Sequence, residues 1–269
     1  MIKVVVCGAG GRMGKRIISL IGDSEDVKLA GAIERSGSPY IGLDAGENAG
    51  AGHLDIGITD NLDLLADMAD VIIDFTEPTA AIEHIKVSRE KMLGIVIGTT
   101  GFSGRELDEI SDAARIIPIV ISPNMSIGIN LIFKVIDDIA RRLSRDYDIE
   151  IVEAHHRLKK DAPSGTAMRM ARILAGARGL DLDKAGVYSR KGMIGERGRD
   201  EIGIQTIRAG DIVGEHTVIF CGPGERIEVT HKAHSRDNFA KGAIIAASWL
   251  SKKAPGLYDM MDVLGLRTK

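Results

Sequence analysis

Short apolar runs alternate with helix-like patterns through the first 122 residues of the chain. Between the runs, apolar residues recur three or four positions apart, as at Met13, Ile17, Ile18 and Ile21, and this spacing predicts amphipathic helices. Unbroken apolar strands with helices between them are typical of a parallel sheet that is covered on both faces. We therefore expect strands at 2–8, 27–34, 69–76, 93–100 and 117–122, with helices at 12–22, 78–91 and 103–115.

Residues 36–57 interrupt this alternation. The stretch holds six glycines and shows no period of either the helical or the strand kind. A segment of this length without a pattern is usually either a functional loop or a disordered one. The sequence leaves both alternatives open.

Beyond residue 126 the pattern changes. The alternating residues of 146–155 predict a half-exposed strand, and the segments 201–210, 214–222 and 225–233 have the pattern of an antiparallel meander. Helices are expected at 126–143, 164–178, 238–250 and 257–263. The predicted fold class is α/β, a Rossmann-type doubly wound parallel sheet plus a smaller α+β domain with an open, mostly antiparallel sheet.

The composition limits the classes of partner. Of 269 residues, 44% are hydrophobic and the net charge is −3, so no overall positive field would recruit nucleic acid or an anionic membrane. The chain shows no signal peptide and no stretch long enough to span a bilayer, which makes a cytoplasmic location the expectation. Cys7 is expected to be a small buried hydrophobe, and the two cysteines form no CxxC pair that would indicate a metal site.

The stretch "GAGGRMG" at 8–14 lies between the first strand and the first helix. In that position glycines let the backbone approach a pyrophosphate, which the N–H groups of the helix start can bind. Glu34 ends the second strand 20 residues after Gly14, where a ribose-binding carboxylate is expected. A tight strand–helix turn without a ligand is the alternative.

Arg35 follows Glu34 and bears on the choice of cofactor. A carboxylate favours the free ribose hydroxyls of NADH, whereas an arginine can bind the 2′-phosphate of NADPH. The pair predicts weak discrimination, unless Arg35 is only a solvated surface cation. The ends of the later strands, "DFT" at 74–76, "GTTGF" at 98–102 and "SPNMS" at 122–126, are expected around the same ligand.

The stretch "EAHHRLKKDAPSGT" at 153–166 gathers histidines, cations and a helix-start signal. Ser164 is predicted to cap a helix, so the N–H groups of Gly165 and Thr166 could bind a carboxylate or phosphate. Adjacent histidines on a strand point to opposite faces, which makes them poor ligands for one metal ion. If the chain stays extended, His155 and Lys159 share a face and could donate protons; a solvated polar strand end is the alternative.

These motifs, with "IRAGDIVGEHTV" and "ERIEVTHKA", resemble the motif set of the 4-hydroxy-tetrahydrodipicolinate reductase family, long called dihydrodipicolinate reductase. The resemblance implies reduction of 4-hydroxy-tetrahydrodipicolinate with loss of water, in lysine biosynthesis through diaminopimelate, with NADH or NADPH as the cofactor. The implied substrate is a small dicarboxylate. Two rivals remain: a dehydrogenase for aspartate or an aspartate semialdehyde derivative, and a non-enzymatic NAD(P)-sensing protein.

The resemblance also implies a role for each site residue. His155 would assist proton transfer and Lys159 would donate the proton. His156, Gly165 and Thr166 would bind the carboxylates of the substrate. The cofactor would be bound by Gly8, Ala9, Gly10, Gly11, Arg12, Met13, Glu34, Arg35, Gly98, Thr99, Thr100, Ser122, Pro123, Asn124 and Met125. Residues 1–126 and 236–269 would form the dinucleotide-binding domain, residues 127–235 the substrate-binding and oligomerisation domain, and the protein would be a homotetramer.

Overall fold

The computed structural model describes residues 1–267 and divides the chain into two units. One unit comprises Met1–Ile127 together with the segment from Arg236 onward, and the other comprises Gly128–Ser235. Each unit has its own sheet and its own apolar core.

The first unit is built on a seven-stranded sheet in which every neighbouring pair is parallel. The apolar runs of the sequence form its central strands, whose side chains are almost all inaccessible to solvent. The strand order is β12-β6-β5-β4-β1-β2-β3. The bounds are β1 (Ile2–Cys7), β2 (Val27–Ile33), β3 (Ile58–Thr59), β4 (Val71–Asp74), β5 (Gly94–Ile97), β6 (Pro118–Ile121) and β12 (Gly256–Tyr258).

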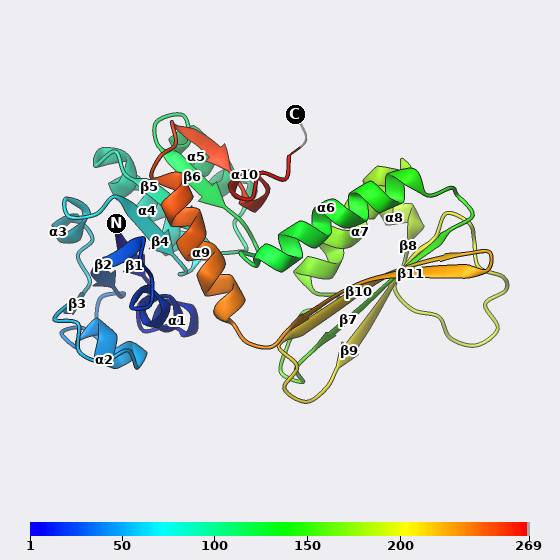
Figure 1. Ribbon diagram of the computed structural model, residues 1–269, viewed down its shortest axis with the longest axis horizontal. Helices are drawn as coiled ribbons and strands as arrows, with labels where there is room; N and C mark the ends of the chain where they lie inside the picture. The colour runs from blue at the N-terminus through cyan, green and yellow to red at the C-terminus, as the bar shows by residue number, and fades with distance from the viewer. Residues whose placement is uncertain (268–269) are drawn as a thin grey trace. The chain divides into compact units, whose positions relative to one another are not determined.

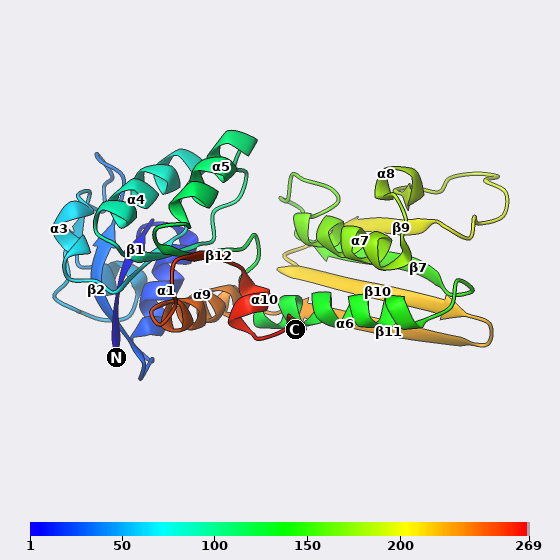
Figure 2. The same cartoon turned by 90° about the horizontal axis from the view of Figure 1, so that it is seen from above.

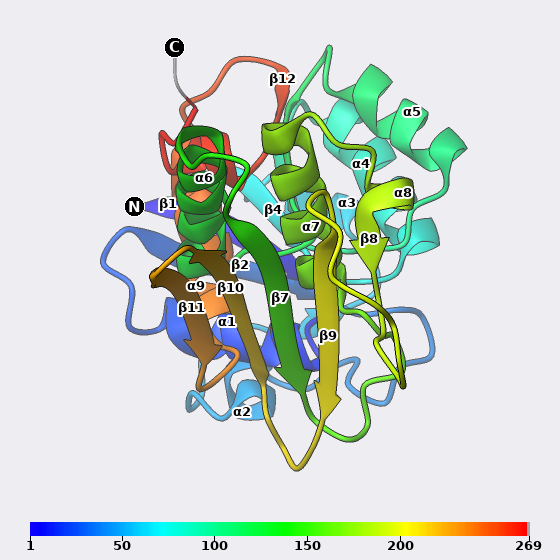
Figure 3. The same ribbon diagram turned by 90° about the vertical axis from the view of Figure 1, so that its right-hand side faces the viewer.

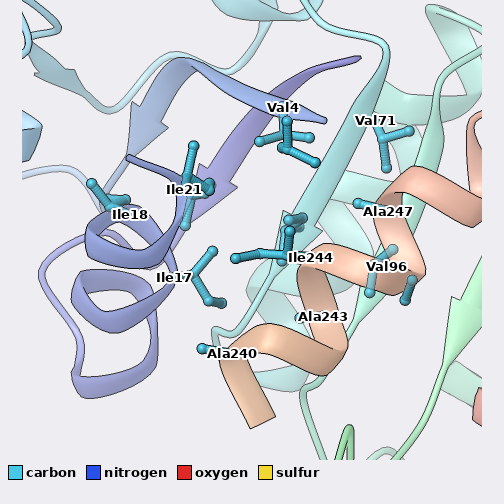
Figure 4. Close-up of a cluster of buried hydrophobic side chains, with 14 of the residues drawn as sticks. Val4, Ile17, Ile18, Ile21, Val71, Val96, Ala240, Ala243, Ile244 and Ala247 are labelled. Atoms are coloured by element: carbon cyan, nitrogen blue, oxygen red, sulfur yellow. The ribbon is translucent and has the colours of Figure 1, made fainter. Parts of the chain in front are cut away.

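Helices cover both faces of this sheet, as Figures 1 and 2 show. Successive side chains of β1 point to opposite faces of the sheet. Val4 and Val6 pack in one core with α1 (Arg12–Ile21) and α9 (Asp237–Leu250), whereas Val5 and Cys7 pack in the core on the other face. The second layer is formed by α4 (Pro78–Glu90) and α5 (Gly104–Ala113). Figure 4 shows the first core, where α1 and α9 bring Ile17, Ala243 and Ala247 together. The short helices α3 (Asp63–Ala66) and α10 (Met260–Val263) complete the unit.

The glycine-rich segment 36–57 is folded, so the disordered alternative is wrong. It contains the helix α2 (Ala45–Ala49) and a bridge between Asp44 and Gly57. The Asp44 carboxylate caps α2 by accepting hydrogen bonds from the N–H groups of Gly46 and Glu47, and it also accepts from Leu54 and Ile56. These bonds, that of Glu47 first, lower the pKa of Asp44 to about 2. The segment is therefore ordered by the hydrogen bonds of one carboxylate, and it has no periodic pattern from which its order could have been predicted.

The second unit is built on a five-stranded sheet in the order β11-β10-β7-β9-β8, which Figure 3 shows edge to edge. The bounds are β7 (Asp148–His155), β8 (Gly186–Val187), β9 (Ile202–Arg208), β10 (Gly214–Gly222) and β11 (Glu225–Ala233). The fold class is confirmed, but the predicted meander is wrong, because β7 lies between β9 and β10. β7 pairs with β10 antiparallel and with β9 parallel, so the sheet is mixed.

Helices α6 (Ile127–Arg142) and α7 (Gly165–Arg178) pack on one face of this sheet, as Figures 2 and 3 show. Their apolar side chains meet those of Ile149, Ile151, Val218 and Phe220 in one core. The opposite face carries partly exposed side chains, including Ile207, which is 47% exposed. The helix α8 (Leu182–Ala185) follows α7. Within residues 1–267, no helix combines the length and the apolar character needed to cross a bilayer.

Candidate active site

The glycine loop joins β1 to α1 in the first unit. Gly8 has a φ of +82°, a left-handed conformation that favours glycine, and its carbonyl would lie 2.0 Å from a Cβ at Gly14. The N-cap of α1 is Gly11, which has no side chain to accept hydrogen bonds from the first N–H groups of the helix. A helix start of this kind is an anion site with room for a backbone-close ligand.

A pocket of about 370 Å³ opens beside this loop. Glu34 and Arg35 lie in its wall. Glu34 also accepts a hydrogen bond of 2.7 Å from the backbone N–H of Gly10, so its carboxylate helps hold the loop. The full lining is Gly8, Gly11, Ile33, Glu34, Arg35, Ser36, Asp60, Phe75, Thr76, Glu77, Ala80 and His84.

The segments 98–100 and 122–125 follow β5 and β6 at the carboxyl edge of the same sheet. Thr99 binds Asp74 through its hydroxyl at 3.1 Å, and Ser122 donates to the carbonyl of Asn124 at 2.8 Å. Met125 is 1% exposed. Among the described residues these segments lie outside the lining of the pocket, so the structure brings them to the same sheet edge but not into the same cavity.

Asp74, the first residue of the "DFT" segment, is the centre of a polar cluster that the sequence did not predict. It is fully buried at the end of β4, and it accepts hydrogen bonds from Thr76, Thr99 and the Nδ1 of His84. The ligand atoms of Cys7, Asp74 and His84 lie within 4.8 Å of one another. Burial, followed by the charge of Asp74, raises the pKa of the Cys7 thiol well above its usual value, which disfavours the thiolate that binds metal ions.

His155 ends β7 in the second unit, and the chain turns there. The N–H of Lys159 donates to the carbonyl of His156 at 3.1 Å, and the N–H of Arg157 donates to the carbonyl of Gly210. The extended course that would have placed His155 and Lys159 on one strand face is therefore wrong. His156 instead pairs through its N–H with the carbonyl of Ile212, and its Nδ1 is a buried atom with no hydrogen-bond partner among the described residues.

The imidazole of His155 is buried and held from both sides. Its Nδ1 lies 2.5 Å from a carboxylate oxygen of Glu153, and its ring meets that of His216 edge-on at 5.1 Å. Burial, followed by the charge of His155, lowers the pKa of His216 to about 3. His216 is therefore neutral over the physiological range. A Cβ at Gly214 would lie 3.0 Å from the Nε2 of His155, so glycine leaves that nitrogen uncovered.

Glu153 is fully buried, although sequence patterning predicted a half-exposed strand. Burial alone would raise the pKa of its carboxyl, but hydrogen bonds from His155, Arg208 and Ser164 outweigh it and lower the pKa to about 2. The signal was present in the sequence. Residues 149, 151 and 153 share one face of a strand, so a glutamate follows two isoleucines on the buried side.

Lys159 and the start of α7 complete this part of the site. The Nζ of Lys159 lies 2.9 Å from the carboxylate of Asp161, and this hydrogen bond lowers the pKa of Asp161. Ser164 caps α7 by accepting a hydrogen bond from the N–H of Ala167, as predicted. Gly165 and Thr166 form the first turn of the helix, where backbone N–H groups favour an anion.

Comparison with known proteins gives a consistent result. Residues 2–125 match the model of the family described as "Dihydrodipicolinate reductase, N-terminus", and residues 128–264 match "Dihydrodipicolinate reductase, C-terminus". The chain is 53% identical to the 4-hydroxy-tetrahydrodipicolinate reductase of Citrifermentans bemidjiense over 267 residues, which cover 99% of this chain and all of the relative. The corresponding reductase of Syntrophus aciditrophicus is also 53% identical, over the full length of both chains.

A solved structure supports the fold. The dipicolinate-bound dihydrodipicolinate reductase from Paenisporosarcina sp. TG-14 superposes with a TM-score of 0.77 at 24% identity, covering 97% of this chain and 98% of the other. An amine dehydrogenase from Mycobacterium smegmatis gives a TM-score of 0.62 at 15% identity, covering 100% and 97%. The two-unit architecture is thus shared by a reductase and a dehydrogenase.

Proposed function

The chain belongs to the dihydrodipicolinate reductase family, and from this premise we propose that it reduces 4-hydroxy-tetrahydrodipicolinate to tetrahydrodipicolinate, with loss of water, in lysine biosynthesis through diaminopimelate. The observation that carries the proposal is the arrangement at 153–166. There a buried, carboxylate-bound histidine, a partly buried lysine and a capped helix start occur within 14 residues.

The reductant is NADH or NADPH, which would bind in the first unit. The residues fit the group, because Gly8 and Gly11 of the loop line the pocket of about 370 Å³ without side chains that would keep a pyrophosphate away from the backbone. When bound, the nicotinamide supplies a hydride, which no amino-acid side chain can provide. Gly8, Ala9, Gly10, Gly11, Arg12 and Met13 would hold the pyrophosphate.

The remaining cofactor residues divide between the two ends of the dinucleotide. Glu34 would bind the adenosine ribose and the exposed guanidinium of Arg35 a 2′-phosphate, which supports use of both cofactors. Gly98, Thr99, Thr100, Ser122, Pro123, Asn124 and Met125 lie at the sheet edge that would flank the nicotinamide.

The second unit would bind the dicarboxylate and supply the proton. One carboxylate would meet the N–H groups of Gly165 and Thr166 at the start of α7, and His156 would bind a substrate carboxylate as well. Hydride addition to a conjugated imine leaves negative charge on the ring, which a positioned acid relieves. Lys159 would donate this proton from its Nζ, and His155 would assist through its uncovered Nε2.

The two units correspond to two roles. Residues 1–126 and 236–269 would form the dinucleotide-binding domain, and residues 127–235 the domain for substrate binding and oligomerisation. The protein would be a homotetramer, and the partly exposed apolar side chains on the open sheet face, such as Ile207 and Ile219, support association of subunits through that face.

The test is a steady-state assay of NAD(P)H oxidation, with the substrate generated in place by the preceding synthase. Lys159→Ala should lower kcat about 100-fold or more while the KM for NAD(P)H changes little, because general acid catalysis contributes about 10²–10⁴-fold. Lys160→Ala is the matched control, since the neighbouring lysine is exposed. Cofactor binding without turnover in the wild-type protein would favour an NAD(P)-sensing role, and an unchanged kcat in Lys159→Ala would remove Lys159 from the chemistry.

A further inference from the structure

Glu153 connects segments that are separate in the sequence. Its Oε2 accepts hydrogen bonds from the Nδ1 of His155 at 2.5 Å and from Arg208 at 2.9 Å. Its Oε1 accepts from the backbone N–H of Ser164 at 3.1 Å, from Arg208 at 2.8 Å and from the hydroxyl of Thr206 at 3.2 Å. The carboxylate therefore holds the imidazole and the residue that starts α7 at the same time.

Arg208 extends these contacts to the loop that carries Lys159. The Nη2 that binds Glu153 also donates to the backbone carbonyl of Asp161 at 2.5 Å. The side chain of Asp161 in turn pairs with the Nζ of Lys159. Two hydrogen bonds of Arg208 thus link Glu153 to the loop of the proposed proton donor.

Packing does not require a carboxylate at this position. The other buried residues on the same face of β7 include Ile149 and Ile151, which pack in the apolar core. A buried ion pair stabilises a fold little better than apolar residues of similar volume, because both charges lose their hydration. Yet three of the four residues that bind Glu153 belong to or hold the proposed site, namely His155, Ser164 and Arg208.

We propose that Glu153 is the positioning residue of this site, which fixes His155 directly, the start of α7 through Ser164, and the lysine loop through Arg208. The inference rests on the proposed function and deepens it. Because the carboxylate accepts the Nδ1 proton of His155, the other nitrogen, Nε2, remains the one that exchanges protons with the substrate. Gly214 leaves that nitrogen uncovered, which agrees with this assignment.

The experiment compares Glu153→Gln with Glu150→Gln in the full-length protein. Glu150 lies on the same strand and binds Arg190 through both oxygens, but it contacts no histidine among the described residues. Glu153→Gln should lower kcat at least about 10-fold, since it disturbs part of the general acid catalysis, and should leave the KM for NAD(P)H within about twofold. Glu150→Gln should change kcat by less than about twofold.

A spectroscopic measurement separates positioning from stability. Nitrogen-15 NMR of the imidazoles reports which ring nitrogen carries the proton, and His155 should be protonated at Nδ1 in the wild-type protein and in Glu150→Gln. In Glu153→Gln its tautomers should be mixed. Glu153→Asp, which restores the charge at a longer distance, should recover part of kcat and the Nδ1 tautomer.

Three results would overturn the proposal: kcat close to that of the wild-type protein in a folded Glu153→Gln, an unchanged tautomer of His155 in that variant, or equal losses in Glu150→Gln. If Glu153→Gln does not fold, Glu153→Asp and Arg208→Lys decide. Arg208→Lys should lower kcat while His155 keeps its Nδ1 tautomer. An unaltered kcat in both Glu153→Asp and Arg208→Lys would count against the positioning role of Glu153. NMR titrations with dipicolinate report on the site even if the wild-type protein lacks the proposed activity. Failure of the proposed function can therefore be distinguished from failure of the positioning role of Glu153.

Discussion

The buried carboxylate of Glu153 should make the second unit lose stability at acid pH in a defined way. Its pKa falls from the ordinary value of 4.5 to about 2 on folding, because hydrogen bonds to the ionised form outweigh burial. A group whose pKa is lowered on folding contributes stability above its unfolded pKa. That stability is lost as the pH falls through the folded pKa.

The magnitude follows from the two pKa values. Each unit of pKa corresponds to about 1.4 kcal/mol, so the full contribution of Glu153 is about 3 kcal/mol near neutral pH. At pH 5 the contribution is still about 3 kcal/mol, and at pH 3 about 1 kcal/mol remains. The wild-type protein should therefore lose about 2 kcal/mol across this window from Glu153 alone, and Glu153→Gln should not.

The assay is urea unfolding of both proteins at several values between pH 5 and pH 3. His216, whose pKa is lowered to about 3, titrates in this window in both proteins. Far-UV circular dichroism follows both units. Trp249 is the chain's one tryptophan and lies in the first unit, so its fluorescence follows that unit separately. The free-energy difference between the two proteins should shrink by about 2 kcal/mol from pH 5 to pH 3 in the dichroism signal. Other carboxylates titrate in both proteins and cancel in this difference.

A difference that stays constant across the window would refute the reasoning, because it would mean that Glu153 has the same pKa in the folded and unfolded chains. A shift of the Trp249 transition as large as that of the dichroism signal would show that the two units unfold together, and the free energies would then refer to the whole chain.

Three further predictions concern other parts of the molecule. Gly214→Ala should lower kcat about 10-fold, because the new Cβ would lie 3.0 Å from the Nε2 of His155 and obstruct that nitrogen; unchanged kcat would contradict this. Arg35→Ala should raise the KM for NADPH about 10-fold and that for NADH little, since a charge-assisted bond to the 2′-phosphate is lost; equal changes would exclude the phosphate role. Asp44→Ala should speed hydrogen exchange at the amide of Leu54, measured by mass spectrometry, and a protected amide would show that the carboxylate does not order the loop.

The sequence alone predicted the elements whose evidence is local. The strands of the first unit follow from unbroken apolar runs, and the cap of α7 follows from Ser164 before a helical pattern. The order of 36–57 could not be predicted in this way, because it depends on one carboxylate that binds four separate backbone groups. Such bonds leave no period in the sequence.

The polar clusters were harder to predict because they join distant segments. Asp74 meets His84 across ten residues and Thr99 across 25, and only the sheet and its covering helices bring them together. Glu153 had a local signal, an acid on the apolar side of a strand, but its partner Arg208 lies 55 residues away. The identity of a buried partner depends on strand order, which hydrophobic patterning does not fix.

The wrong prediction of a meander also explains why the contacts at the centre of the site could not be predicted from the sequence. In a meander β9 would lie against β10, and β7 would be placed elsewhere. In the structure β7 lies between them, so His155 is opposite Arg208 on one side, and Glu153 is opposite His216 on the other. The parallel pairing of β7 with β9 sets Arg208 beside the carboxylate, and the antiparallel pairing with β10 sets Gly214 beside the imidazole. The buried carboxylate and the uncovered nitrogen of His155 therefore both require β7 at the centre of a mixed sheet.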